Sequence, residues 1–183
     1  GVVLGHVQSG KTANYTAVIA KAADAGYRMF VVLSGMTNKL RRQTRRRLYE
    51  DLCAPNDDRW INLTTREEDF RSGENNANAF LTEHSNCKVL GVVKKNHARL
   101  ANLLEWFQRA HRHILQRCPV LIIDDEADQA SLNTAKRREE RTRINKLILQ
   151  ILNTLPKVAY VGYTATPYAN VFVDPTMPVP GQN

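Results

Sequence analysis

The sequence predicts an α/β domain with a mostly parallel central β-sheet and helices on both faces. Two observations predict this class. Short apolar runs rich in β-branched residues alternate along the 183 residues with segments of helical spacing, which is the order of a doubly wound fold. Most of these runs are continuous and do not alternate with polar residues, as in strands that are buried on both faces.

Six apolar runs are expected to form strands, at residues 2–4, 29–33, 60–63, 88–93, 120–123 and 158–163. Four segments between them have helical spacing, at residues 13–25, 38–52, 98–115 and 143–155. Gly26 follows the first of these helices as a C-terminal cap. His111 and His113 are expected to close the third helix, where they would interact favourably with its dipole.

Two segments look irregular. Residues 65–86 are polar and are expected to form a long surface excursion, and residues 174–183 are rich in proline and read as a linker or a truncated loop. The domain is therefore expected to span residues 1–173. The sequence starts directly on strand-like residues, which suggests a piece of a longer protein.

Composition narrows the function classes. Hydrophobic residues make up 43% of the chain, as in a globular protein. No apolar run approaches the roughly 20 residues of a membrane span, and no signal peptide opens the chain, so no membrane partner is expected. Three widely spaced cysteines suit a reducing cytoplasm. The formal net charge of +8 favours an anionic partner such as nucleic acid without identifying it.

The most specific motif is "GHVQSGKT", which satisfies G-x-x-x-x-G-K-[ST] between a predicted strand and a predicted helix. Its glycines let backbone N–H groups wrap around phosphate oxygens, and the helix directs its positive N-terminus at them. Lys11 would reach the β- and γ-phosphates, and Thr12 would offer a hydroxyl to Mg²⁺. The nucleotide-binding residues are therefore expected to be Gly5, His6, Val7, Gln8, Ser9, Gly10, Lys11 and Thr12.

An acidic cluster follows the predicted strand at residues 120–123. Asp124, Asp125, Glu126 and Asp128 lie within five positions, and such crowding raises carboxylate pKa values unless a cation or donors relieve it. Taken alone, such a cluster is better explained as a solvated loop after a core strand. Beside a phosphate-binding loop, it predicts that Asp124 or Asp125 holds Mg²⁺ and that Glu126 deprotonates the attacking water.

The order of motifs resembles superfamily-two helicases and translocases. "DEAD" at residues 125–128 and "GYTATP" at residues 162–167 follow the phosphate-binding loop as motifs II and III follow motif I. "TNKLRRQ" at residues 37–43 is similar to motif Ia, and "VVKKNHARL" at residues 92–100 occupies the place of motif Ib. More narrowly, the chain is similar to the helicase-like part of bacterial Z-one-domain proteins, which are endonuclease-associated ATPases of restriction and defence islands.

This resemblance implies a P-loop NTPase of the RecA-like type, a three-layer sandwich that binds and hydrolyses ATP with Mg²⁺. It implies that Lys11 and Thr12 bind phosphate and metal, that Asp125 positions the metal, that Glu126 is the general base and that Asp128 helps couple the nucleotide to a bound strand. It further implies contacts to nucleic acid, DNA more than RNA, or coupling roles. The candidates for these roles are Thr37, Asn38, Arg41, Arg42, Lys94, Lys95, Thr164 and Thr166.

Two departures from the family pattern matter. Gln8 stands where many relatives have another glycine, and the adenine-reading motif lies outside this sequence, so a preference for ATP is inherited from the family alone. The second RecA-like domain, expected on the same polypeptide, is also absent from the 183 residues. It would supply an arginine finger, so the isolated domain is expected to be nearly inactive.

The basic segment after the second predicted strand allows two interpretations. Arg41 and Arg45 form one helical row, and Arg42 and Arg46 form the next. They could track nucleic-acid phosphates, or they could form a solvated face. The leading function is thus the first motor domain of a helicase-like ATPase, and the alternative is a nucleotide-dependent switch or scaffold. A small-molecule kinase would not explain "GYTATP", and a GTPase would need an absent Asn-Lys-x-Asp motif.

Overall fold

The computed structural model describes residues 1–4, 10–71, 73, 76–82, 86–125 and 135–164. Within them, one six-stranded sheet has the strand order β1-β6-β5-β2-β4-β3, and every neighbouring pair is parallel. The strands are β1 (Val2–Leu4), β2 (Met29–Ser34), β3 (Trp60–Asn62), β4 (Lys88–Lys94), β5 (Val120–Asp125) and β6 (Val158–Thr164).

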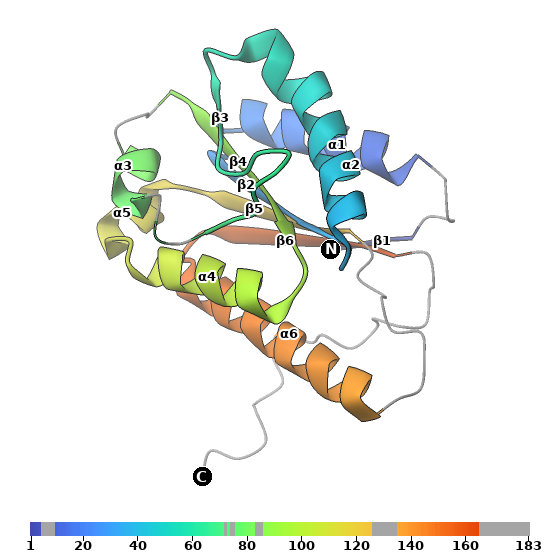
Figure 1. The fold of residues 1–183 in the computed structure, drawn as a ribbon. Helices are drawn as coiled ribbons and strands as arrows, with labels where there is room; N and C mark the ends of the chain where they lie inside the picture. The colour runs from blue at the N-terminus through green and yellow to red at the C-terminus, as the bar shows by residue number, and fades with distance from the viewer. Residues whose placement is uncertain (5–9, 72, 74–75, 83–85, 126–134, 165–183) are drawn as a thin grey trace.

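Helices cover both faces of this sheet (Figure 1). One face carries α1 (Lys11–Asp24) and α2 (Asn38–Leu48), which continues into a short π-helical turn (Tyr49–Cys53) and a 3₁₀ turn (Ala54–Asn56). The other face carries the remaining helices, which are α3 (Ala77–Thr82), α4 (His97–Gln108), α5 (Arg112–Arg117) and α6 (Ala135–Thr154).

Strand alternation divides the core into two layers, because successive side chains of a strand point to opposite faces. On β5, Leu121 and Ile123 pack under α1 with Tyr15 and Ile19. Val120 and Ile122 of the same strand pack on the other face. The members of that second layer that come from the long helices are Leu100, Leu103, Leu104, Trp106, Phe107, Ile144, Ile148 and Ile151. This alternation decides where the acids at the end of β5 point.

The C-terminal ends of β1, β5 and β6 lie level with one another. Leu4 pairs in register with Thr164, and Asp125 pairs with Tyr163 of the strand between them. In an open parallel sheet, the loops at the carboxyl ends of the strands form the binding crevice. The carboxyl end of β1 and the aspartates of β5, Asp124 and Asp125, therefore lie at one edge of the sheet.

The α/β class, the parallel sheet and all six predicted strands are confirmed, with ends that differ by one or two residues. The first helix ends as expected at Gly26, which has φ 96°. The N–H of Tyr27 bonds to the carbonyl of Ala22, and the N–H of Gly26 bonds to that of Ala23, the Schellman pattern. Within the described residues, no helix is long and apolar enough to cross a membrane.

The third predicted helix is wrong, because residues 98–115 lie in two helices, α4 and α5. The break comes at His111, whose backbone is extended (φ −64°, ψ 135°) and which is the N-cap residue of α5. Its N–H donates to Asn78 Oδ1. His111 therefore begins a helix, so the expected pairing of His111 and His113 with a C-terminal dipole does not apply.

The expected surface excursion at residues 65–86 is also corrected. This segment contains α3, and three of its apolar side chains are buried, Phe70, Ala77 and Leu81. The Phe70 ring meets Trp106 of α4 edge-on, with centroids 5.7 Å apart. The segment is polar on average, so its composition did not indicate that three of its side chains are buried in the core.

Candidate functional site

The N-terminus of α1 and the end of β5 form the centre of the candidate site. Gly10 precedes the helix with φ 75°, a left-handed conformation that favours glycine. A Cβ at this position would meet no atom within 4 Å, so the backbone angle and not crowding explains the residue. Lys11 and Thr12 then form the first turn of α1, and the helix N-terminus favours an anion there.

A buried tyrosine joins this turn to the end of β5. The Tyr15 hydroxyl lies 3.2 Å from Asp125 Oδ2, to which it donates, and 3.4 Å from Thr12 Oγ1. Its ring packs edge-on against Tyr163 of β6 with centroids 5.4 Å apart, and the Tyr163 hydroxyl donates to Asn14 Oδ1 at 2.7 Å. Thr12 and Asp125 are thus held within reach of one phenol.

The Asp125 carboxyl is a partly desolvated acid with nearby cations. Burial raises its pKa above the ordinary value, and the charge of Asp124 adds to that rise. The Tyr15 hydrogen bond and the charges of Lys11 and Lys95 lower it. The pKa of Tyr15 is itself raised, first by burial and then by the Asp125 charge, so the phenol stays a hydrogen-bond donor.

Asp124 points to the opposite face of the sheet. Its Oδ1 lies 2.5 Å from Lys95 Nζ, and its Oδ2 accepts from the Tyr160 hydroxyl at 2.7 Å. Lys95 and Asp124 are both buried, with side chains 7% and 5% exposed. Both Asp124 oxygens therefore have protein partners on the α4 and α6 side, away from Lys11 and Thr12.

Two residues expected to contact nucleic acid are instead buried. Lys95 pairs with Asp124, as described above. Arg41 is 1% exposed, and its guanidinium donates to the carbonyls of Thr65 (3.0 Å) and Arg66 (2.9 Å). Neither cation is on the surface in this arrangement, so neither is placed to contact a phosphate strand.

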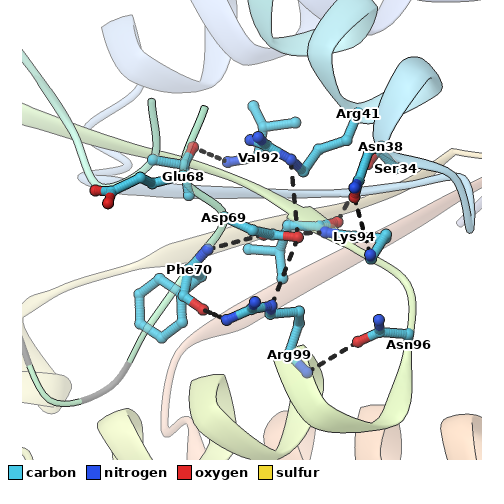
Figure 2. A network of polar contacts seen from close by, with 12 residues as sticks. Ser34, Asn38, Arg41, Glu68, Asp69, Phe70, Val92, Lys94, Asn96 and Arg99 are labelled. Atoms are coloured by element: carbon cyan, nitrogen blue, oxygen red, sulfur yellow. Dashed lines mark hydrogen bonds and ion pairs between the residues drawn. The ribbon is translucent and has the colours of Figure 1, made fainter. Parts of the chain in front are cut away.

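Figure 2 shows the polar network around Arg41. Arg41 Nε lies 3.7 Å and Arg99 Nε 3.9 Å from Asp69 Oδ2, and the other Asp69 oxygen accepts from the backbone N–H groups of Phe70 and Lys94. This network fixes residues 65–70 against α2 and the N-terminal end of α4. Arg41 therefore stabilises the fold, a role that the residues next to it in the sequence do not indicate.

Four other expected contact residues, Thr37, Asn38, Arg42 and Lys94, lie near the start of α2. Thr37 caps this helix by accepting from the Leu40 N–H, and Asn38 Oδ1 accepts from Lys94 Nζ at 2.9 Å. Arg42 is exposed, whereas Thr164 is 1% exposed at the end of β6. The expected site residues outside the described part of the chain are Gly5, His6, Val7, Gln8, Ser9, Glu126, Asp128 and Thr166.

Reasoning from the sequence missed the tyrosines that hold the two acids. Tyr15 lies four residues before Ile19, so it belongs to the apolar row of α1 and reads as a core residue. Tyr160 lies in an apolar strand and reads in the same way. Nothing in the local sequence marks either hydroxyl as a partner of Asp125 or Asp124, because those pairs are 110 and 36 residues apart.

No protein-family model and no curated protein matches the chain. Among the residues that the structure describes, no group of three or more His, Cys, Asp or Glu side chains could hold a metal ion.

Proposed function

We propose that the chain is a RecA-like P-loop domain that binds and hydrolyses ATP, the first motor domain of a superfamily-two helicase or translocase acting on nucleic acid. One observation carries this proposal. Lys11 and Thr12, from the motif after β1, lie at the same sheet edge as Asp125, and Tyr15 contacts both Thr12 and Asp125. Tyr15 and Asp125 are 110 residues apart in sequence, so it is the fold of the sheet that brings this part of α1 and the end of β5 together.

Mg²⁺ fits the donors at this edge. A hydroxyl and a carboxylate are hard oxygen ligands, and Mg²⁺ in such enzymes is bound through one or two carboxylates together with substrate phosphates. Asp125 is favoured over Asp124 for this role, because Asp124 faces the other side and both its oxygens are occupied. Thr12 and Asp125 would hold the ion, and its charge would offset the negative charge that develops during phosphoryl transfer.

The residues of the chain would supply positioning and proton transfer. Lys11 and the backbone N–H groups of residues 5–12 would hold the β- and γ-phosphates. Glu126 would take a proton from a water as that water attacks the γ-phosphorus. The bond to the bridging oxygen would then break, and ADP would leave with the electron pair. A second RecA-like domain would contribute the arginine that stabilises this transition state.

The surface near the start of α2 is the proposed place of the nucleic acid. Thr37, Asn38, Arg42 and Lys94 lie there, and the net charge of +8 favours an anionic partner. DNA is proposed over RNA from the resemblance to bacterial restriction and defence ATPases. All three cysteines are free thiols, namely Cys53, Cys87 and Cys118. Free thiols are compatible with the proposed cytoplasmic location.

A second candidate is a nucleotide-dependent switch that binds ATP and a protein partner without moving along a strand. The burial of Arg41 and Lys95 favours this alternative, because two of the expected strand contacts are lost. The same site would bind and hydrolyse ATP in either case. The candidates therefore differ in whether nucleic acid stimulates turnover.

The deciding experiment measures ATP turnover by the full protein with and without single- and double-stranded DNA and RNA. A motor is expected to be stimulated by one of these strands, and a switch by none. Lys11→Ala should abolish nucleotide binding, since the charge on the phosphates is lost. Glu126→Gln should keep binding and lose hydrolysis, and wild-type turnover by that variant would refute the assigned base.

A further inference from the structure

We propose that Lys95, Asp124 and Tyr160 form a buried clasp that positions the Asp125 carboxylate for a Mg²⁺-bound nucleotide, so that Lys95 is a positioning residue and not a nucleic-acid contact. This inference rests on the proposed function, because it assigns Asp125 to the metal. It deepens that function by naming residues on the far face of the sheet that the nucleotide site requires.

The clasp joins four neighbouring strands, with Lys95 and Asp124 at the C-terminal ends of β4 and β5 and Tyr160 in the middle of β6. Lys95 directly follows β4, and its N–H donates to the carbonyl of Ser34 on β2 at 3.0 Å. Its side chain then passes β2 to reach Asp124 on β5. Tyr160 of β6 donates to the same carboxylate from the other side. The end of β5 is therefore held from both flanks.

The clasp reaches Asp125 through the backbone. Lys95 Nζ also lies 3.4 Å from the main-chain oxygen of Asp125, the last residue of β5. Asp124 and Asp125 share a peptide bond and point to opposite faces, so fixing one side chain and the next carbonyl fixes the direction of the other side chain. Tyr15 meets the Asp125 carboxylate only if that direction is kept.

The clasp also manages charge at the site. Two adjacent carboxylates repel each other, and the effect is strong where burial lowers the local dielectric. The Lys95 ammonium lies 2.5 Å from Asp124 Oδ1 and compensates the Asp124 charge. The Asp125 carboxylate therefore remains available to Lys11 and to an incoming cation. Buried ion pairs add little net stability compared with apolar packing, and specifying one arrangement is a better attested use for them.

The test compares the full protein with Lys95→Met, Lys95→Met/Asp124→Asn and Tyr160→Phe. Affinity for a fluorescent ATP analogue is measured in EDTA and in Mg²⁺, and the ratio of the two affinities reports the metal contact alone. Arg41→Met is the matched control. Like Lys95→Met, it removes a buried cation that lies beside a buried aspartate, in this case Asp69. Thermal denaturation of each variant monitors folding.

Lys95→Met is expected to reduce the Mg²⁺ enhancement by about 10- to 100-fold, the usual cost of losing a partner behind a metal ligand, while affinity in EDTA changes less than about twofold. The double variant should recover thermal stability, since it removes the uncompensated charge, but its ratio should stay lowered because the clasp is still missing. Tyr160→Phe should lower the ratio in the same direction by a smaller factor. Arg41→Met should lower thermal stability and leave the ratio unchanged.

An unchanged ratio in Lys95→Met and Tyr160→Phe would show that the clasp does not position Asp125. An equal fall of the nucleotide affinities in EDTA and in Mg²⁺ would show the same. If Lys95→Met does not fold, a normal ratio in both Tyr160→Phe and the double variant overturns the clasp as a positioning device, and a lowered ratio in Tyr160→Phe supports it. Failure of the proposed function looks different, because the wild-type protein itself would then show no Lys11-dependent binding or no Mg²⁺ enhancement.

Discussion

At the scale of single residues, the two consecutive aspartates differ because a strand turns each successive side chain to the other face. Asp125 lies under α1 with a desolvated carboxyl, whereas Asp124 is paired with Lys95 and Tyr160. Ionisation of Asp125 is therefore unfavourable in the absence of a cation, and a bound metal would relieve that cost. The Asp124 charge is already compensated by Lys95 and by the Tyr160 hydroxyl. The same substitution at the two positions should therefore have opposite effects.

Asp125→Asn should raise the midpoint of thermal unfolding at pH 7 without nucleotide. The folded-state pKa of Asp125 is raised, so the wild-type protein loses stability as pH rises from the unfolded-state pKa through the folded one. The variant escapes this loss, and its advantage should vanish by about pH 3, below the unfolded-state pKa, where the wild-type acid is largely protonated in both states. Melting curves at pH 7 and pH 3 check this.

Asp124→Asn is the matched control for that experiment and should be destabilising. It leaves the buried Lys95 ammonium without its counter-charge, and breaking a buried pair typically costs about 3–5 kcal/mol. Destabilisation by both substitutions would contradict the account of Asp125 as a strained acid. Only Asp125→Asn is expected to remove the Mg²⁺ enhancement of nucleotide binding altogether.

Tyr15→Phe tests the phenol that contacts both sides of the site. The variant keeps the ring against Tyr163 but removes the donor to Asp125, so the pKa of Asp125 should rise further. We expect a loss of about 0.5–1.5 kcal/mol in the free energy of unfolding and weaker Mg²⁺-dependent nucleotide binding. Denaturant titration and fluorescent-nucleotide binding measure the two effects, and Tyr27→Phe, at a half-buried tyrosine beyond the far end of α1, is the control.

At the scale of elements, the sequence predicted the strands well because continuous apolar runs buried on both faces have few alternatives. It could not predict which row of α2 faces inward, since both rows are basic. The answer depends on Asp69, an acid in a segment that looked like solvent-exposed loop. The break before α5 was missed for a related reason, because its signal is the contact between His111 and Asn78, 33 residues away.

The two rows of α2 give a prediction at this scale. Arg42 and Arg46 are exposed, Arg41 is buried, and Arg45 lies over the Tyr49 ring at 4.5 Å. Replacing Arg42 and Arg46 with glutamine should weaken nucleic-acid binding and flatten the dependence of log affinity on log salt by roughly 0.7–0.9 per lost phosphate contact. Nucleotide binding should not change.

The inward row should respond in the opposite manner. Arg41→Gln with Arg45→Gln should lower the melting temperature, because the Asp69 network loses its central donor. It should leave the salt dependence as it is. If neither double variant alters nucleic-acid binding, the exposed row is a solvated face and the switch function gains support.

At the scale of the whole molecule, the parallel sheet explains why distant motifs converge. Six strands running in one direction end at one edge, so the carboxyl ends of β1, β4, β5 and β6 lie along the same edge whatever their separation in sequence. The α/β class and the placement of Lys11 at the same sheet edge as Asp125 could be predicted from motif order and strand direction. The tyrosine and lysine partners could not, because they depend on which face each side chain occupies.

The last prediction concerns turnover by residues 1–183 alone. If this chain is a first motor domain, the transition-state arginine comes from a second domain, and such an arginine contributes about 10³- to 10⁵-fold in rate. ATP turnover by the purified chain should therefore stay barely above background, although Lys11-dependent binding of Mg²⁺-nucleotide persists. A coupled phosphate-release assay measures this, and Lys11→Ala subtracts any contaminating ATPase. Brisk turnover proportional to protein concentration would mean that a residue of this chain completes the site, whereas turnover rising with its square would mean that a second copy does.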